Sequence, residues 1–287
     1  MGLHINNNIE AQNTLRNLTT AQSMFSKSMQ RLSSGKRVNS AADDAAGYAI
    51  SQKLLAQSKG LDQASANSQD AISLIQTANG GIQTQLDLLQ RMRQLSVQAS
   101  NGTLNGTAGA TGAATGDYAA IQLEGDQIAK EITQISSTTQ FNNKQLLSGG
   151  AAGTNVTFQV GANAGETLSV TIGGSDATAL TVATGAGAAT AALDLSSATT
   201  LTNISTAINT LTQEAATLGS TQNRLTAAMS NLAIGSENMT AAYSAITNVN
   251  MAQESTALAT AQILQQSSTA MLAQANQAPQ GVLKLLG

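Results

Sequence analysis

Apolar residues recur every three or four positions along residues 201–246, which is the spacing of one face of a long α-helix. The apolar members of this stripe are Leu201, Ile204, Ile208, Leu211, Ala215, Leu218, Leu225, Met229, Leu232, Met239, Tyr243 and Ile246. Its only polar positions are Gln222 and Ser236. A continuous helix of this extent would be roughly 70 Å long at about 1.5 Å per residue. Because so narrow a stripe must pack against other helices, the pattern favours a rod-like subunit that builds an assembly.

The same spacing predicts helices over residues 5–33, 44–100 and about 117–136, and a final helical region that runs from about 200 to 284. Residues 101–116 are rich in Gly, Thr and Ala and contain two Asn-Gly steps, which predicts a turn that reverses the chain. The chain has a single proline, so long helices can continue without interruption. The predicted fold is therefore mainly helical.

The hydrophobic period changes from three or four residues to two between residues 156 and 172. Apolar residues alternate with polar ones on both sides of a glycine-containing turn at 161–165. The apolar residues are Val156, Phe158 and Val160 before the turn and Leu168, Val170 and Ile172 after it. This alternation predicts a β-hairpin. Residues 173–200, in contrast, are mostly Gly, Ala, Thr and Ser, and we expect them to form only a small excursion or exposed loops.

The segment from Ser255 to Leu283 contains no charged residue, yet it keeps an apolar seam. With Leu258 and Leu272 beside it, the seam consists of Ala257, Ala261, Leu264, Ser268, Met271 and Ala275. Ordering one residue costs about 1–2 kcal/mol of backbone entropy, whereas burying one large apolar side chain returns about 1.5–3 kcal/mol. A lone helix with so few large side chains is marginal in water. We therefore expect both ends of the chain to order fully only when subunits pack together.

The composition argues against several classes of partner. The chain is 41% hydrophobic, largely through alanine, with three Phe, three Tyr and no Trp, which suits thin helical layers. A formal charge of −3 with 13 scattered basic residues provides no patch for nucleic acid. No window is long and apolar enough for membrane insertion, and the first ten residues lack the pattern of a general secretory signal.

Candidate catalytic or metal-binding groups are few. His4 is the only histidine and the chain has no cysteine, so a zinc site would need scattered carboxylates, which zinc seldom uses. Asp43 and Asp44 are adjacent, so on a helix they would point about 100° apart; we interpret them as first-turn acids after a Ser40 cap. We therefore expect no catalytic residue, no cofactor and no bound metal.

Five groups of segments, weak one by one, together resemble the bacterial flagellin family in their order and spacing, and they extend from one end of the chain to the other. They are Ile5-Asn-Asn-Asn-Ile9; Arg31-Leu-Ser-Ser-Gly35 with Val38-Asn-Ser40 and Asp43-Asp-Ala-Ala-Gly47; Leu89-Gln-Arg-Met-Arg93; Phe158-Gln-Val-Gly-Ala-Asn-Ala-Gly165; and Ser268 with Met271-Leu-Ala-Gln-Ala-Asn-Gln-Ala-Pro-Gln-Gly-Val-Leu283. The resemblance implies a structural subunit that polymerises into the flagellar filament for swimming motility, without catalysis.

The resemblance also implies a fold: mainly α, with long antiparallel helices in a coiled-coil-like bundle, a small β-hairpin region and paired terminal helices. Residues 1–43 and 237–287 would form the inner-tube helical domain, residues 44–140 and 200–236 the outer-tube helical domain, and residues 141–199 the hairpins and a short variable excursion. Filament assembly would rest on inner-tube contacts of Leu15, Leu18, Phe25, Met29, Leu32, Leu258, Leu264, Met271 and Leu272.

A third implication concerns partners and destination. The subunit would be exported unfolded through the flagellar type III apparatus and join an extracellular homopolymer, so neither a cleavable signal nor a disulfide is expected. Besides copies of itself, it would bind an export chaperone, the junction proteins and the filament cap.

Two alternative functions stay open. One is a hook–filament junction protein, against which segments 158–165 and 278–282 argue; the other is a flagellin-like cell-surface binding protein, for which the sequence offers no recognisable ligand pocket.

In similar flagellins a Toll-like receptor of animals reads an arginine, a leucine and a glutamate, which match Arg91, Leu95 and Glu124, with Gln90 beside them. Spacing alone favours a solvated helix face around Arg91 over a patch that binds a partner. Gly125 replaces an apolar residue of the family pattern, at a cost of about 1 kcal/mol in helix stability.

Two further comparisons with the family pattern concern individual positions. Gln94 stands where an acid is usual. The family's C-terminal leucines, here Leu283, Leu285 and Leu286, are implicated in recognition by the export chaperone and by a cytosolic immune receptor, although Lys284 interrupts the usual pattern.

Overall fold

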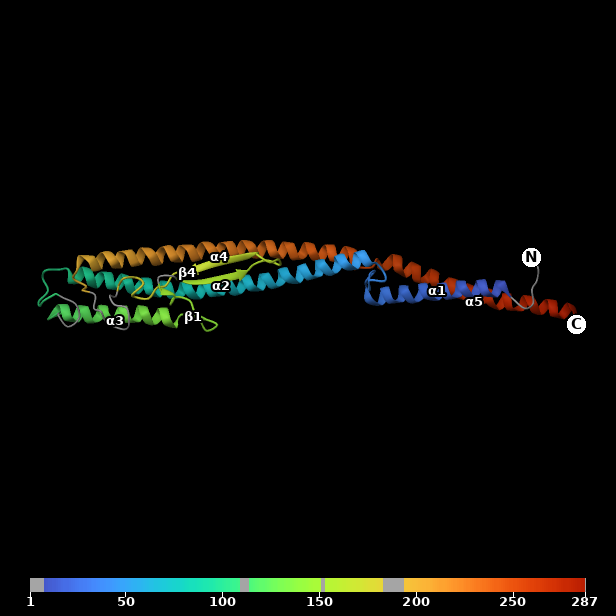
Figure 1. Cartoon of the computed structure of the whole chain (residues 1–287), viewed down its shortest axis with the longest axis horizontal. Helices are drawn as coiled ribbons and strands as arrows, with labels where there is room; N and C mark the ends of the chain where they lie inside the picture. Colours follow the sequence, from blue (N-terminus) through green and yellow to red (C-terminus); the bar gives the residue numbers. More distant parts are fainter. Residues whose placement is uncertain (1–7, 109–113, 151–152, 183–193, 287) are drawn as a thin grey trace. The chain divides into compact units, whose positions relative to one another are not determined.

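The computed structural model describes residues 8–108, 114–150, 153–182 and 194–286, with side chains as far as residue 277. In order along these residues, the elements are α1 (Ile9–Ser34), α2 (Ala45–Ala99), α3 (Asp117–Thr138), β1 (Gln140–Phe141), β2 (Lys144–Gln145), β3 (Thr154–Gln159), β4 (Thr167–Ile172), α4 (Ala198–Thr247) and α5 (Met251–Leu286) (Figure 1). The predicted fold class is therefore confirmed, because long helices dominate and the strands form only small antiparallel hairpins.

Contacts divide the chain into two compact units. The terminal unit comprises Met1–Ser58 and Glu237–Gly287, and the central unit comprises Lys59–Ser236. Both dividing points fall inside long helices, so the division follows packing and not the ends of secondary structure.

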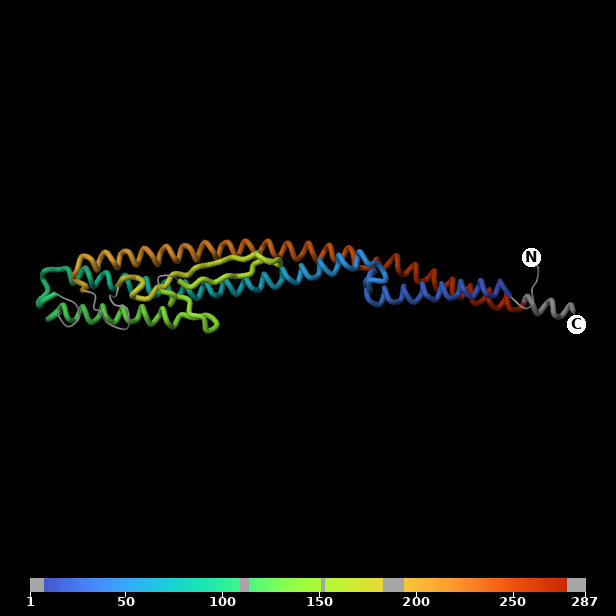
Figure 2. The backbone as a smooth tube through the Cα atoms, viewed as in Figure 1, coloured from blue at the N-terminus to red at the C-terminus, as the bar shows by residue number. Residues whose placement is uncertain are grey.

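The terminal unit is built on α1 and α5, which pack side by side and run antiparallel (Figure 2). At one end of the pair, the Asn8 amide donates a hydrogen bond to the carbonyl of Ala275 at 2.7 Å. Near the other end, Arg31 Nη1 lies 3.7 Å from Glu254 Oε2. Asn8 also caps α1, because its side-chain oxygen accepts the N–H of Ala11 at 3.0 Å. The helix consequently begins later than residue 5, where the periodicity had placed its start.

The start of α2 differs from the prediction in its capping residue. The Asp44 carboxylate accepts a hydrogen bond from the N–H of Gly47 at 2.9 Å and so caps the helix. Ser40 does not cap it: its N–H and hydroxyl donate to Asp43 Oδ2 at 3.2 and 3.3 Å. The expectation of a Ser40 cap was therefore wrong, since the first acid closes the preceding loop and the second begins the helix.

The final helical region predicted over about 200–284 consists of two helices, with an interruption at residues 248–250. Asn250 caps the second of the two helices, because its side-chain oxygen accepts the N–H groups of Ala252 and Gln253 at 3.1 and 3.3 Å. An asparagine followed three residues later by glutamine resembles a helix-start signal, and this signal was overlooked because the apolar stripe continues across it.

The break between α4 and α5 pairs with the break between α1 and α2. The N–H of Arg37 donates to the Thr247 carbonyl at 2.6 Å, and the N–H of Val249 donates to the Gly35 carbonyl at 3.0 Å. Gly35 ends α1 with φ near 68°, a left-handed conformation that glycine adopts without strain. The two interruptions thus satisfy each other's backbone groups within the terminal unit.

The central unit contains the large hydrophobic core. Its buried side chains come from α2, α3, α4 and the segments between them, and the largest fully buried ones are Ile75, Ile82, Leu89, Met92, Leu95, Ile132, Leu146, Leu147, Ile172, Leu195, Ile204 and Leu218. The predicted hairpin is present as β3 paired with β4, with Val156 opposite Val170 (Figure 1). A second hairpin, β1 with β2, was not predicted because each of its strands has only two residues, too few to show a period.

Gln85 joins three parts of the central unit. Its side chain is fully buried, and its amide nitrogen donates to the carbonyls of Ile132 on α3 and Ser175 after β4, both at 3.1 Å.

Among the described residues, no helix has the length and apolar character that crossing a bilayer would require.

Candidate assembly surface

The seam between α1 and α5 is made mainly of small and medium side chains. Buried residues at the seam include Ala21, Ser28, Ala261 and Ala275. Small side chains let two helix backbones approach closely, so the pair can pack without large apolar groups between its helices. The seam therefore leaves many of the larger apolar residues of both helices on the outside.

The structure separates the nine predicted assembly residues into two groups. Partly buried at or beside the seam are Leu18, Phe25, Leu32, Leu258 and Leu272. About half exposed are Leu15, Met29, Leu264 and Met271. On α5 the packed positions also differ from the expected seam, because Leu258, Gln265 and Leu272 are more buried than Ala257, Leu264 and Met271. The packed face is thus displaced by one residue at these positions.

Exposed large apolar side chains are concentrated in the terminal unit. Among the described residues, nine of them belong to this unit: Ile9, Leu15, Met24, Met29, Ile50, Met251, Ile263, Leu264 and Met271. The larger central unit contributes three, namely Val97, Leu123 and Ile234. Apolar residues exposed on several faces of a helix pair are typical of a surface that other chains cover. The terminal unit therefore carries the candidate assembly surface.

The loop between α1 and α2 is tied to α1 by an ion pair. Lys27 Nζ lies 3.1 Å from Asp43 Oδ1, while the N–H groups of Asn39 and Ser40 donate to Asp43 Oδ2 at 3.3 and 3.2 Å. The hydrogen bond from Lys27, assisted by these N–H groups and partly offset by desolvation, holds the pKa of Asp43 below its ordinary value of 3.8. This carboxylate therefore stabilises the loop in its charged form.

The predicted receptor-contact residues are only partly on one surface. Arg91 on α2 and Glu124 on α3 form an exposed ion pair, with Arg91 Nη2 2.7 Å and Nε 2.8 Å from Glu124 Oε1. Gln90 is exposed next to them, whereas Leu95 is 2% exposed and belongs to the central core. Three of the four side chains can thus touch a partner directly, and the leucine supports the helix beneath them.

The predicted C-terminal contact residues lie in the last turns of α5. Leu283, Leu285 and Leu286 belong to α5, which continues to Leu286, but their side chains lie outside the described part of the chain.

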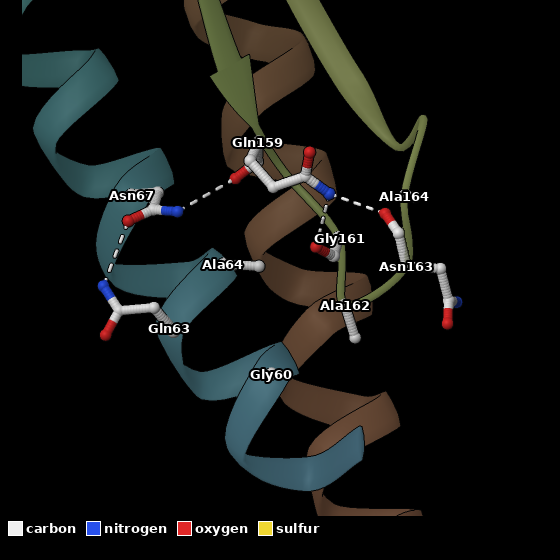
Figure 3. A pocket seen from close by; sticks show the side chains of 9 residues that line it. All are labelled: Gly60, Gln63, Ala64, Asn67, Gln159, Gly161, Ala162, Asn163 and Ala164. Atoms are coloured by element: carbon white, nitrogen blue, oxygen red, sulfur yellow. Dashed lines mark hydrogen bonds between the residues drawn. The ribbon is translucent and has the colours of Figure 1, made fainter. Parts of the chain in front are cut away.

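A depression of about 370 Å³ lies where the tip of the β3–β4 hairpin meets α2 (Figure 3). Asn67 on α2 donates to the carbonyl of Gln159 at 3.2 Å, and the Gln159 amide donates to Gly161 and Asn163 at 2.9 and 2.7 Å. Gly60 allows this approach, since a Cβ there would lie 2.9 Å from Ala162 Cβ. The amides around the depression hold the hairpin tip against the helix.

Two further observations bear on chemistry at the surface. Asn163 donates from its N–H and its amide to Glu166 at 2.9 and 3.0 Å, and these bonds lower the pKa of Glu166. Within the described ranges, no three His, Cys, Asp or Glu side chains come together as a metal site would need.

Comparisons with known proteins agree with this arrangement of helices. Residues 5–152 match the family model of the bacterial flagellin N-terminal helical region, and residues 201–286 match that of the bacterial flagellin C-terminal helical region. A flagellin of Halalkalibacterium halodurans is 44% identical over 289 residues, covering 98% of this chain and 99% of the relative. The match to a flagellin of Bacillus subtilis is 43% identical over 311 residues, covering 99% and 100% of the two chains.

A similar relationship extends to spirochaetes. The flagellar filament 33 kDa core protein of Treponema phagedenis is 39% identical over 292 residues, which covers 98% of this chain and 99% of that protein. Both helical regions and nearly the full length of each relative are therefore matched. The chain belongs to the bacterial flagellin family, the structural subunits of the flagellar filament.

Proposed function

We propose that this chain polymerises through its terminal unit into a helical filament that serves swimming motility, and that it has no catalytic role. The observation that carries the proposal is the concentration of exposed apolar side chains on α1 and α5. The uncharged segment from Ser255 to Leu283 occupies most of α5. A helical segment without charges on any face is suited to contact other protein on several sides.

This proposal gives different roles to the residues buried between α1 and α5 and to the apolar residues exposed on the pair. Small residues at the seam, such as Ala21 and Ala261, pair α1 with α5 inside one subunit. The exposed group, including Leu15 and Leu264, is then free to contact neighbouring subunits. Burial of each such side chain contributes about 1.5–3 kcal/mol when complete, so a few per subunit are enough to drive a repeating contact.

Electron microscopy of the purified full chain tests the proposal. After addition of a filament seed or a kosmotropic salt, the full chain should form long tubes. A variant lacking residues 1–33 and 248–287 should stay monomeric under the same conditions while circular dichroism shows a helical central unit. A full chain that stays monomeric under every condition would contradict the proposal, as would filaments formed by the truncated variant.

Export and partner recognition are further parts of the proposal. The subunit would leave the cell unfolded through the flagellar type III apparatus and act outside the cell. The marginal ordering that we expect for the uncharged C-terminal segment supports passage through a narrow channel, because little stability must be overcome. Before export, Leu283, Leu285 and Leu286 would contact the export chaperone. The same three leucines would be the contact for a cytosolic immune receptor, and the junction proteins and filament cap would bind the assembled chain. Replacing the three leucines by serine should reduce chaperone co-purification.

The exposed surface around Arg91, Glu124 and Gln90 is proposed as the contact for an animal Toll-like receptor. The support is the pairing of a cation and a carboxylate on two neighbouring helices, which fixes the geometry of a polar contact. Buried Leu95 would act indirectly by holding α2 in place.

A further inference from the structure

Four methionines lie on the surface of the α1–α5 pair. They are Met24, Met29, Met251 and Met271, and each is between 47% and 57% exposed. Met92, on α2 in the central unit, is 1% exposed. Met229 and Met239, on α4, are partly buried. The four most exposed thioethers among the described residues therefore lie on the candidate assembly surface, while the fully shielded Met92 serves as an internal reference.

Three of these methionines flank the seam and do not fill it, and the fourth, Met251, is the exposed first residue of α5. Met24 precedes the partly buried Phe25, Met29 follows the buried Ser28, and Met271 precedes the partly buried Leu272. Residues next to a packed position on a helix lie about 100° around its axis, at the border of the packed face. A neighbouring subunit that covers this border would bury the thioethers against other protein.

A thioether sulfur reacts readily with a hydroperoxide when the reagent can reach it. With hydrogen peroxide as the oxidant, the sulfur lone pair attacks one peroxide oxygen, the S–O bond forms as the O–O bond breaks, and water is the leaving group. The sulfur loses two electrons and the peroxide gains them. The product is a sulfoxide, whose polar oxygen needs a hydrogen-bond partner when it is buried.

We propose that Met24, Met29, Met251 and Met271 are sites of sulfoxide modification in the free subunit, and that their oxidation blocks its addition to the filament. Assembly shields the same side chains, so a filament resists the peroxide that disables unassembled subunits. The inference rests on the proposed polymerisation through the terminal unit. It deepens that function by assigning a chemical control to the surface that carries it.

The test treats the purified full-length subunit with hydrogen peroxide and follows each methionine by peptide mass spectrometry. Exposed methionines should gain one oxygen while Met92 stays unmodified. Seeded elongation should then require at least roughly tenfold more subunit, because a buried sulfoxide oxygen without a partner weakens association by about that factor or more. Enzymatic reduction by methionine sulfoxide reductases should restore elongation without any mutation.

A matched variant carries M24L, M29L, M251L and M271L. Leucine is close to methionine in volume and cannot be oxidised, so this variant should elongate like the native chain both before and after peroxide. Equal elongation by native subunits that carry all four sulfoxides would overturn the inference. So would a loss of elongation in the leucine variant after peroxide. If untreated native subunits never elongate, the proposed function itself has failed, and that outcome is visible before any oxidant is added.

Discussion

Leu195 occupies the space into which a side chain at position 125 would project. A Cβ atom on Gly125 would lie 2.7 Å from Leu195 Cδ2 and 2.8 Å from Cδ1. Leu195 is 1% exposed and is fixed by its own backbone: its N–H donates to Gln122 Oε1 at 3.2 Å, and its carbonyl accepts from the Ser96 hydroxyl at 2.8 Å. The glycine that weakens α3 in isolation thus makes room for the leucine that anchors the chain before α4.

This relationship predicts that G125A and L195A do not act independently on stability. Alone, G125A should destabilise the chain or leave it unchanged, because the gain of about 1 kcal/mol in helix propensity is opposed by collision with Leu195. In a background of L195A the same change should stabilise by about 1 kcal/mol, since the collision is gone. Urea unfolding of the two single variants and the double variant measures the coupling.

L195A should itself cost about 2–5 kcal/mol through the cavity it leaves. An additive result, in which G125A has the same effect in both backgrounds, would show that the contact between the two residues carries no energy.

The buried Gln85 should be far less tolerant of change than its exposed neighbour Gln83. Q85M keeps the length of the side chain but removes the donor shared by the Ile132 and Ser175 carbonyls. We expect a loss of about 1–3 kcal/mol in the free energy of unfolding, because polar groups are left without partners inside the core. Q83M, on the solvent side of the same turn, should change stability by less than about 0.5 kcal/mol. Similar costs for both variants would refute the prediction.

Sequence periodicity predicted the helices well because each buries one face, and a residue such as Leu218 must recur at the helical spacing to reach the core. It failed where a polar side chain decides the outcome locally. The cap at Asn250 begins a new helix without changing the apolar stripe. Asp44 rather than Ser40 begins α2 for a similar reason, since both residue types cap equally well and only the loop geometry separates them.

The candidate assembly surface was harder to predict than the fold. Met271 and Leu272 are adjacent, and both fit an apolar seam whose register is free to shift by one residue. The structure places the second against α1 and leaves the first exposed. Pattern alone could not make this choice, because residues 255–283 of α5 are apolar or neutral on every side and the partner helix sets the orientation.

Acid should weaken the loop between α1 and α2 through Asp43. The pKa of Asp43 in the folded chain lies below its ordinary value of 3.8, so the unfolded chain binds the proton more readily. The contribution of this carboxylate is therefore fully present above 3.8 and is lost as the pH falls through the lowered pKa. We expect the urea midpoint of native subunits to fall with pH in this range more steeply than that of D43N.

K27Q provides the matched control for this titration. Removing the ammonium takes away the largest cause of the lowered pKa, so K27Q should also flatten the pH dependence, although less completely than D43N because the two backbone N–H donors remain. Parallel pH profiles for the native chain and both variants would contradict the assignment.

The exposed pair of Arg91 and Glu124 should matter for recognition and little for stability. R91A should change the free energy of unfolding by at most about 1 kcal/mol, because exposed ion pairs contribute little in water. It should nevertheless reduce signalling in cells that report on the Toll-like receptor. R93A removes an exposed arginine two residues away that forms no ion pair in the described structure, so it is the control. Full signalling by R91A would remove the basis for this receptor contact.

Leu264 offers the most direct test of the assembly surface, because it is about half exposed on α5 and contributes little to packing within the subunit. L264D should therefore leave the circular dichroism of the monomer unchanged while abolishing polymerisation. An unpaired carboxylate buried between subunits costs about 3 kcal/mol or more, which raises the concentration needed for elongation by about a hundredfold or more. L264M preserves the volume and the apolar character and should elongate normally. Filaments of normal length from L264D, seen by electron microscopy beside those of L264M, would show that neighbouring subunits do not cover this face.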